Sequence, residues 1–164
     1  MNPIIENIKE KYAAYILAYT TYAGEHNFLI AVKDLLFFMK ALKEEFHFEG
    51  LIDITAVDRL TEEERFEIAY NLVSYSQGIR IRVKVRVDED NPHVPSLTEI
   101  WKSANWYERE AYDMMGIIFD NHPDLRRMFL PEDFTYYPLR KEFPLIGVPG
   151  SIPLPEKDPP KPYK

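Results

Sequence analysis

The chain of 164 residues is long enough for one domain with its own core, and its composition, 46% hydrophobic and 29% charged, is that of an ordinary globular protein. Its formal net charge of −7 argues against a nucleic-acid binder, because such proteins gain affinity by neutralising phosphates with lysine and arginine. The absence of cysteine excludes disulfides and thiolate ligands for iron–sulfur clusters, and no apolar run approaches the roughly 20 residues that cross a bilayer.

The first segment predicts a helix over residues 3–17. Ile5, Ile8 and Tyr12 recur near the 3.6-residue helical period. Pro3 stands in the first turn, where its missing N–H does no harm. The opening MNPIIENIKEKY carries two Glu and two Lys and lacks the apolar stretch of a signal peptide, so we expect the protein in the cytoplasm.

A strand over residues 27–32 and a second helix over residues 34–46 follow. The strand reads NFLIAV, a short apolar run. In the helix, Leu35 and Met39 lie one turn apart on the side expected to face the core. Asp34 stands where an N-cap residue is expected.

Three strands are predicted next, over residues 51–58, 66–75 and 79–87. The polar turn TEEER separates the first two, and Ser-Gln-Gly separates the second from the third. Such short connections favour an antiparallel meander. The third strand, IRIRVKVRV, alternates strictly between apolar and basic residues, as expected for a half-buried strand.

The basic row of this strand is Arg80, Arg82, Lys84 and Arg86. One interpretation is a docking face for an acidic partner. The other, which we favour, is a solvated face whose cations pair with acids on neighbouring strands.

A short helical segment is predicted within residues 93–105, followed by a helix that begins at Asn105 and ends at Gly116. Asn105 is a good N-cap residue, and Glu108 stands three positions on, as a capping box requires. Glycine at the C-terminal end completes the pattern. The sequence IIF should then be extended, and NHPD is typical of a turn.

The chain as a whole predicts an α+β fold. The N-terminal helices should pack on a mainly antiparallel sheet, followed by a helix–turn unit and an extended Pro-rich tail. We divide the chain into a domain over residues 1–143 and a C-terminal arm over residues 144–164, which holds seven of the thirteen prolines. The tail is either frayed or laid along a neighbouring subunit. Its apolar side chains favour the second interpretation, since a disordered tail has little need of them.

The stretch WYEREAYDMMGIIFDNHPDLRRMFLPEDF, from Trp106 to Phe134, resembles an active site because it is dense in carboxylates and arginines. Glu110 and Asp113 share a helix face and, with His122, are candidates for acid–base catalysis. The neighbouring arginines indicate ion pairs instead. An ion pair lowers the pKa of its carboxylate, and a carboxylate with a lowered pKa is a poor general acid.

The sequence gives little support for a metal site or a nucleotide-binding site. His122 with Asp120 and Asp124 is a conceivable metal site, but no two histidines have metal-ligand spacing. A His-Pro turn whose ring hydrogen-bonds the backbone is the better interpretation. The chain has no nucleophile elbow, phosphate loop or dinucleotide fingerprint. The residues therefore indicate a compensated charge cluster that fixes a backbone shape or meets a partner.

The same stretch, followed by YPLRKEFPL, resembles the signature of the 30-kDa subunit family of respiratory complex I, the NuoC-like family. About forty continuous residues carry the match. The residues that correspond to the family motif are expected to be architectural and partner-facing rather than catalytic. They are Glu108, Arg109, Glu110, Asp113, Gly116, His122, Pro123, Arg126, Arg127, Pro131, Leu139, Arg140 and Lys141.

The resemblance implies a scaffold subunit in the peripheral arm of a membrane-bound, ion-translocating redox complex, on the cytoplasmic side of the cell membrane. It implies no redox centre in this chain. The expected partners are a chain like the large subunit of [NiFe]-hydrogenase, a cluster-bearing small subunit and other peripheral-arm subunits, with iron–sulfur clusters and possibly nickel–iron held there. The alternative is an enzyme with an acid–base site at Glu110, Asp113 and His122.

The resemblance leaves the host complex open. Complex I-like NADH/quinone oxidoreductases, energy-converting [NiFe] hydrogenases and ferredoxin-linked relatives all contain this domain. The compact length and the tail, which lacks the extension of many quinone-linked members, favour a hydrogenase-type or ferredoxin-linked host.

Overall fold

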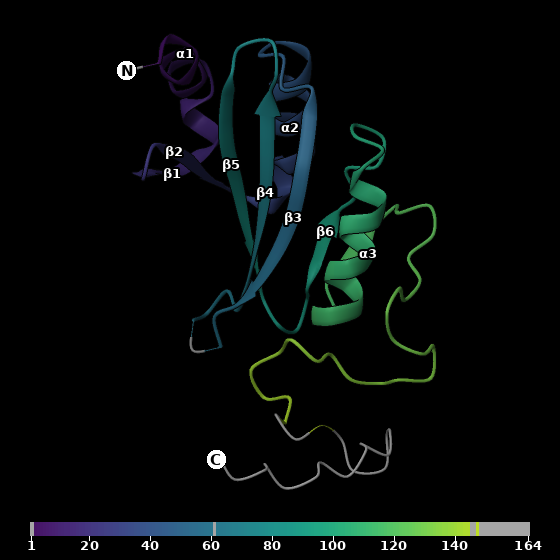
Figure 1. Ribbon diagram of the computed structural model, residues 1–164. Helices are drawn as coiled ribbons and strands as arrows, with labels where there is room; N and C mark the ends of the chain where they lie inside the picture. The colour runs from purple at the N-terminus through teal and green to yellow at the C-terminus, as the bar shows by residue number, and fades with distance from the viewer. Residues whose placement is uncertain (1, 61, 145–146, 148–164) are drawn as a thin grey trace, which may run out of the picture.

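A five-stranded mixed sheet organises the chain in the computed structural model, which describes residues 2–60, 62–144 and 147 (Figure 1). The strands lie in the order β1-β2-β5-β4-β3. Only β2 and β5 run parallel, and the other neighbours are antiparallel. The strands are β1 (Ile16–Tyr22), β2 (Glu25–Ile30), β3 (Gly50–Asp58), β4 (Phe66–Ser74) and β5 (Ile79–Val87).

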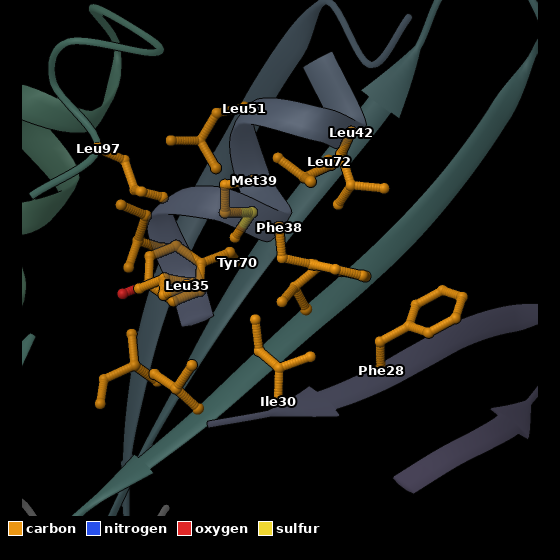
Figure 2. Close-up of a cluster of buried hydrophobic side chains, with 14 of the residues drawn as sticks. Phe28, Ile30, Leu35, Phe38, Met39, Leu42, Leu51, Tyr70, Leu72 and Leu97 are labelled. Atoms are coloured by element: carbon orange, nitrogen blue, oxygen red, sulfur yellow. The ribbon is translucent and has the colours of Figure 1, made fainter. Parts of the chain in front are cut away.

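Two helices, α1 (Pro3–Lys11) and α2 (Leu35–Glu44), pack against one face of this sheet. The ring of Tyr12, just after α1, lies 5.8 Å from the ring of Phe38 in α2. Figure 2 shows side chains of α2 pointing toward those of β2 and β4. The labelled core residues are Phe28, Ile30, Leu35, Phe38, Met39, Leu42, Leu51, Tyr70, Leu72 and Leu97.

The N-terminal helix is shorter than the sequence predicts. It ends at Lys11 rather than residue 17, a 3-10 turn spans Ala13–Tyr15, and β1 begins at Ile16. The segment ILAYTTY is rich in aromatic and β-branched residues, and pairing with β2 overrides the helical periodicity. Asn2 caps α1, accepting the Ile4 N–H at 3.0 Å.

The predictions for β2, α2 and the meander β3–β4–β5 are confirmed to within a few residues. The expected cap at Asp34 is wrong. Asp34 belongs to a 3-10 turn with helical backbone angles, and its side chain accepts no capping hydrogen bond.

The basic row of β5 pairs with acids on neighbouring elements, as the favoured interpretation requires. Lys84 Nζ lies 2.8 Å from the carboxylate of Glu67, and Arg86 Nε lies 3.1 Å from it. Arg82 Nη2 lies 3.0 Å from Glu25. Opposite charges across strands thus neutralise most of this face.

A second unit packs beside β3. It consists of β6 (His93–Pro95), α3 (Ala104–Met115) and β7 (Ile118–Asp120), with β6 and β7 paired in parallel. Residues 93–103 form β6 and turns, and residues 104–105 already belong to α3, so the separate helical segment predicted within residues 93–105 is wrong. No described helix is long and apolar enough to span a bilayer.

Helix α3 ends where the sequence predicts and begins differently. Gly116 adopts φ 75° and its N–H bonds the Tyr112 carbonyl at 2.8 Å, which is a left-handed C-terminal cap. Ser103 occupies the N-cap position without a side-chain bond to the helix N–H groups, so the predicted capping box of Asn105 and Glu108 is wrong. The extended IIF and the NHPD turn are confirmed. The expected course of residues 144–164 along a partner stays a prediction, because all of these residues except 144 and 147 lie outside the described residues.

Candidate functional site

The anchored loop, residues 126–144, follows the NHPD turn and runs alongside α3 and beneath it (Figure 1). It contains no helix or strand, and none of its side chains is buried. A segment without buried apolar groups gains little from the hydrophobic effect. Its shape must therefore depend on polar contacts to the domain.

Asp113 of α3 supplies the first of these contacts. Its buried carboxylate accepts the backbone N–H groups of Met128 at 2.9 Å, Phe129 at 2.7 Å and Leu130 at 3.1 Å. Arg127 Nη1 donates to the same carboxylate at 2.7 Å. Burial by itself would raise the pKa of Asp113, but the Phe129 N–H, the Arg127 guanidinium and the other two N–H groups together lower it. Asp113 is thus an ionised, saturated acceptor.

Two arginines fasten the main chain of the loop to α3. Arg127 Nη1 also donates to the Asp113 carbonyl at 3.1 Å, and its Nη2 donates to the Tyr136 carbonyl at 3.3 Å. Arg109, on α3, donates to the carbonyls of Arg126 at 3.1 Å and Arg127 at 3.2 Å. The arginines thus satisfy backbone carbonyls that the irregular loop would otherwise leave unpaired.

Arg140 caps the C-terminal end of α3 with its side chain. Its Nε donates to the Met115 carbonyl at 2.8 Å, and its guanidinium carbon lies 4.6 Å from the ring centre of Tyr137 and 4.9 Å from that of Phe66. A cation at this end complements the helix dipole. A Cβ at Gly116 would lie 2.7 Å from Arg140 Nη2 and from the Tyr137 ring, so glycine is required for space as well as for its positive φ.

A buried ion pair, which the sequence analysis missed, holds the far end of the loop. Asp58, at the end of β3, accepts Arg65 Nε at 2.9 Å and Arg65 Nη2 at 2.7 Å, together with the Lys141 backbone N–H at 2.7 Å. Arg65 also pairs with Glu142 and, at 2.7 Å, with Glu89. The Arg65 guanidinium holds the pKa of Asp58 well below its usual range. The signal for this pair was their closeness in sequence, since Asp58 ends β3 and Arg65 is the last residue of the TEEER turn that follows.

The candidate acid–base site does not assemble. Glu110 is exposed, and no hydrogen bond or ion pair among the described residues joins it to Asp113 or His122. The ring of His122 donates from Nε2 to the Asn105 carbonyl at 3.1 Å and accepts the Asp124 N–H at Nδ1 at 3.0 Å. Burial lowers the pKa of His122, which favours this neutral tautomer. The prediction that the ring bonds the backbone is confirmed.

Metal ligation at this turn also lacks geometric support. Asp120 pairs with His93 at 2.8 Å, and Asp124 pairs with Arg126 at 2.6 Å. Within the described ranges, no three His, Asp or Glu side chains gather closely enough to hold a metal.

Glu108, on α3, is buried. Its carboxylate accepts Ser96 Oγ at 2.7 Å and the Leu97 N–H at 2.6 Å, so it joins the helix to the turn after β6. His122 Nε2 lies 3.9 Å away. Burial raises the pKa of Glu108 to about 7, against the opposing effect of the Ser96 and Leu97 bonds. Its role is internal cross-linking.

The exposed residues of the anchored loop include large apolar side chains as well as charged ones. Phe129 is 61% exposed and Leu139 57% exposed, and Tyr136 is exposed beside them in sequence. Pro131 is exposed as well, as is Pro123 in the preceding turn. A loop that polar contacts fix to the domain, and that exposes large apolar side chains to solvent, is suited to binding another protein.

Comparisons with known proteins identify the family of the chain and chains of similar sequence. The family model described as respiratory-chain NADH dehydrogenase, 30 Kd subunit, matches residues 28–149. The chain is 42% identical over 146 residues to the NuoC-type subunit of the NADH-quinone oxidoreductase of Geotalea uraniireducens, covering 89% of each. It is 40% identical over 147 residues to the corresponding protein of Geobacter sulfurreducens, covering 89% of this chain and 91% of the relative.

Two solved structures share the fold. A trypsin-resistant fragment of Nqo5, residues 1–134, is 34% identical with a TM-score of 0.67, covering 74% of this chain and 99% of the fragment. A chain of the membrane-bound sulfane sulfur reductase, an archaeal respiratory membrane complex, is 28% identical with a TM-score of 0.75, covering 87% of this chain and 85% of that one. The expected α+β fold is confirmed.

Proposed function

Because the chain belongs to the family of the 30 Kd subunit of respiratory-chain NADH dehydrogenase, we propose that it is an architectural subunit in the peripheral arm of a membrane-bound, ion-translocating redox complex. The observation that carries the proposal is the anchored loop, since its inner side is fixed by polar contacts while Phe129 and Leu139 face outward. A preorganised loop loses little conformational entropy when a partner covers it.

The partner we propose for the anchored loop is a chain like the large subunit of [NiFe]-hydrogenase, with a cluster-bearing small subunit nearby. Iron–sulfur clusters, and nickel–iron in a hydrogenase-type host, would belong to those subunits. The lack of cysteine in this chain supports that division, because protein-held clusters use mostly cysteine thiolates. We place the chain on the cytoplasmic side of the membrane, as a peripheral component.

The motif residues act in this proposal through the anchored loop. Asp113, Arg127 and Arg109 shape its first half, and Arg140 with the Lys141 backbone shapes its second. None of them would take part in catalysis. We further propose that residues 144–164 form an arm along a neighbouring subunit.

We propose an NADH-quinone oxidoreductase as the first candidate for the host complex, although the compact length of the chain had favoured a hydrogenase-type host. The Geotalea relative is as compact, since 146 matched residues make up 89% of both chains. Compactness therefore does not favour a hydrogenase-type host. The likeness to a chain of the archaeal sulfane sulfur reductase keeps a related respiratory host as the second candidate.

The acid–base alternative requires a carboxylate or imidazole able to exchange protons with a substrate. Asp113 is saturated by four donors, and both ring nitrogens of His122 bond the backbone. Candidates in that state are poor proton-transfer groups. The geometry therefore favours the architectural role.

Co-purification tests the proposal. The chain is tagged at its N-terminus, native membranes are solubilised in mild detergent, and the associated chains are identified by mass spectrometry. We expect a hydrogenase-like large subunit and a cluster-bearing small subunit. The double variant Phe129→Asp, Leu139→Asp should lower their yield at least tenfold without changing the melting temperature. The matched control is Tyr75→Asp, an aromatic residue 72% exposed on the turn after β4, which should retain them.

Two results would contradict the proposal: recovery of this chain alone, or full retention of partners by the double variant. A chain cut to residues 1–145 tests the arm in the same assay. It should fold and bind its partners more weakly, whereas unchanged binding would exclude the arm.

A further inference from the structure

Strand β1 is an uncovered edge of the five-stranded sheet, and β2 is its sole strand neighbour among the described residues (Figure 1). The opposite edge of the sheet, β3, is covered by other parts of the chain. Helix α3 packs beside it, and Ser103 Oγ and Trp101 Nε1 donate to the carbonyls of Leu51 at 3.0 Å and Glu49 at 3.1 Å. Within the described part of the chain, one edge of the sheet is thus covered and the other is open.

Strand β1 carries a bulge but lacks charged residues and proline, two other features that protect an open edge. Edge strands of soluble proteins commonly carry charges or proline that block pairing with another chain. Residues 12–24, YAAYILAYTTYAG, contain neither. Leu17 is 67% exposed and Tyr22 81% exposed. The outward N–H and C=O groups between them form a template for another strand.

A bulge shapes the start of this edge. Ile16 pairs with Ile30 and Ala18 pairs with Leu29, so Leu17 is an extra residue without a partner on β2. A bulge redirects the inserted side chain. Here it places a leucine in solvent at one end of the strand, while Tyr22 is exposed at the other.

We propose that an extended, uncharged and apolar-rich segment of a different subunit of the host complex pairs with β1 and extends the sheet by one strand. The inference rests on the proposed function. A seven-residue strand offers about 23 Å of edge. A second copy of this chain is a poorer occupant, because each copy carries a net charge of −7 and the two would repel. An uncharged segment of another chain meets no such repulsion.

The position of β1 deepens the architectural role. The strand lies at one end of the sheet order, whereas β3 and α3, which bears the anchored loop, lie at the other. Four strand spacings, about 19 Å, separate the two edges. The subunit that supplies the added strand is therefore expected to lie on the other side of the domain from the one that covers the anchored loop.

Amide hydrogen exchange tests the proposal on the full chain, alone and within the co-purified complex. We expect the outward amides of Ile16–Tyr22 to exchange at least tenfold more slowly in the complex. The double variant Leu17→Lys, Tyr22→Lys should remove that protection and release one partner, while Tyr75→Lys should do neither. Circular dichroism and the melting temperature verify that the variants fold. The comparison of exchange in the isolated wild-type chain and in its complex tests the proposal even if a variant does not fold.

The outcomes separate this inference from the proposed function. If partners co-purify but β1 exchanges equally fast in both states, the added strand is excluded and the architectural role stands. If β1 is already protected in the isolated chain, light scattering gives the occupant: a dimer means a second copy and a monomer means the same chain, and either overturns the proposal. If no partner co-purifies, both inferences fail.

Discussion

Arg127 holds Asp113 at two different atoms: one guanidinium nitrogen donates to the Asp113 carboxylate at 2.7 Å and to the Asp113 main-chain carbonyl at 3.1 Å. The loop is therefore tied to the side chain and the backbone of α3 at once. Both residues are buried or nearly so. Breaking such a pair costs much more than breaking a pair on the surface, because the remaining charge stays in a poorly solvated place.

Replacing Asp113 with alanine should destabilise the chain by about 3–5 kcal/mol, since it strands Arg127 and three backbone N–H groups. Urea unfolding measures the loss. Trypsin should also cut after Arg126 or Arg127 faster than in the wild type. The control Glu110→Gln changes an exposed acid on the same helix and should stay within about 0.5 kcal/mol. If the Asp113→Ala variant is as stable as this control, the contacts of Asp113 do not fix the loop.

Replacing Gly116 with alanine should lower the free energy of unfolding by more than the strain of the left-handed backbone angle alone. That angle costs about 1–2 kcal/mol for a residue with a Cβ, and the new atom would also lie 2.7 Å from Arg140 and Tyr137. Gly78→Ala is the matched control, because Gly78 has φ 65° but open space around it. The difference between the two variants in urea unfolding isolates the contact. Equal losses would mean that Arg140 and Tyr137 move aside freely.

Glu108 should make stability fall as pH rises. Its pKa in the folded chain is about 7, above the unfolded value of 4.5, so the folded state binds the proton more tightly. The resulting stabilisation is present below pH 4.5 and is lost as pH rises through 7, amounting to about 3 kcal/mol.

Glu108→Gln should therefore lose less stability than the wild type between about pH 5 and pH 8, measured by urea unfolding at each pH. The comparison concerns the slope, because glutamine also alters the bonds to Ser96 and Leu97. Glu110→Gln should keep the wild-type slope. Parallel pH profiles for wild type and Glu108→Gln would rule out Glu108 as the titrating group.

Sequence reasoning succeeded where one local pattern decides the structure. The strict alternation of β5 and the glycine after α3 both lead directly to the observed elements. The basic row also pairs as expected, because antiparallel neighbours place acids opposite it.

It failed where tertiary contacts override a local pattern. The apolar spacing up to Tyr12 led to a predicted helix over residues 3–17, yet pairing with β2 makes the segment from Ile16 a strand. Glu108 stands at a capping-box position but turns inward to Ser96 and Leu97. The ion pair of Asp58 and Arg65 depends on strand register, which periodicity alone does not reveal.

The two ends of the anchored loop are tied to parts of the chain that are far apart in sequence, Asp113 on α3 and Asp58 at the end of β3. The loop can take its shape only when the sheet and α3 have both folded and docked. Under the proposed function, a chain with an incomplete domain would present no ordered loop to its partner, and defective copies would therefore be kept out of the assembled complex.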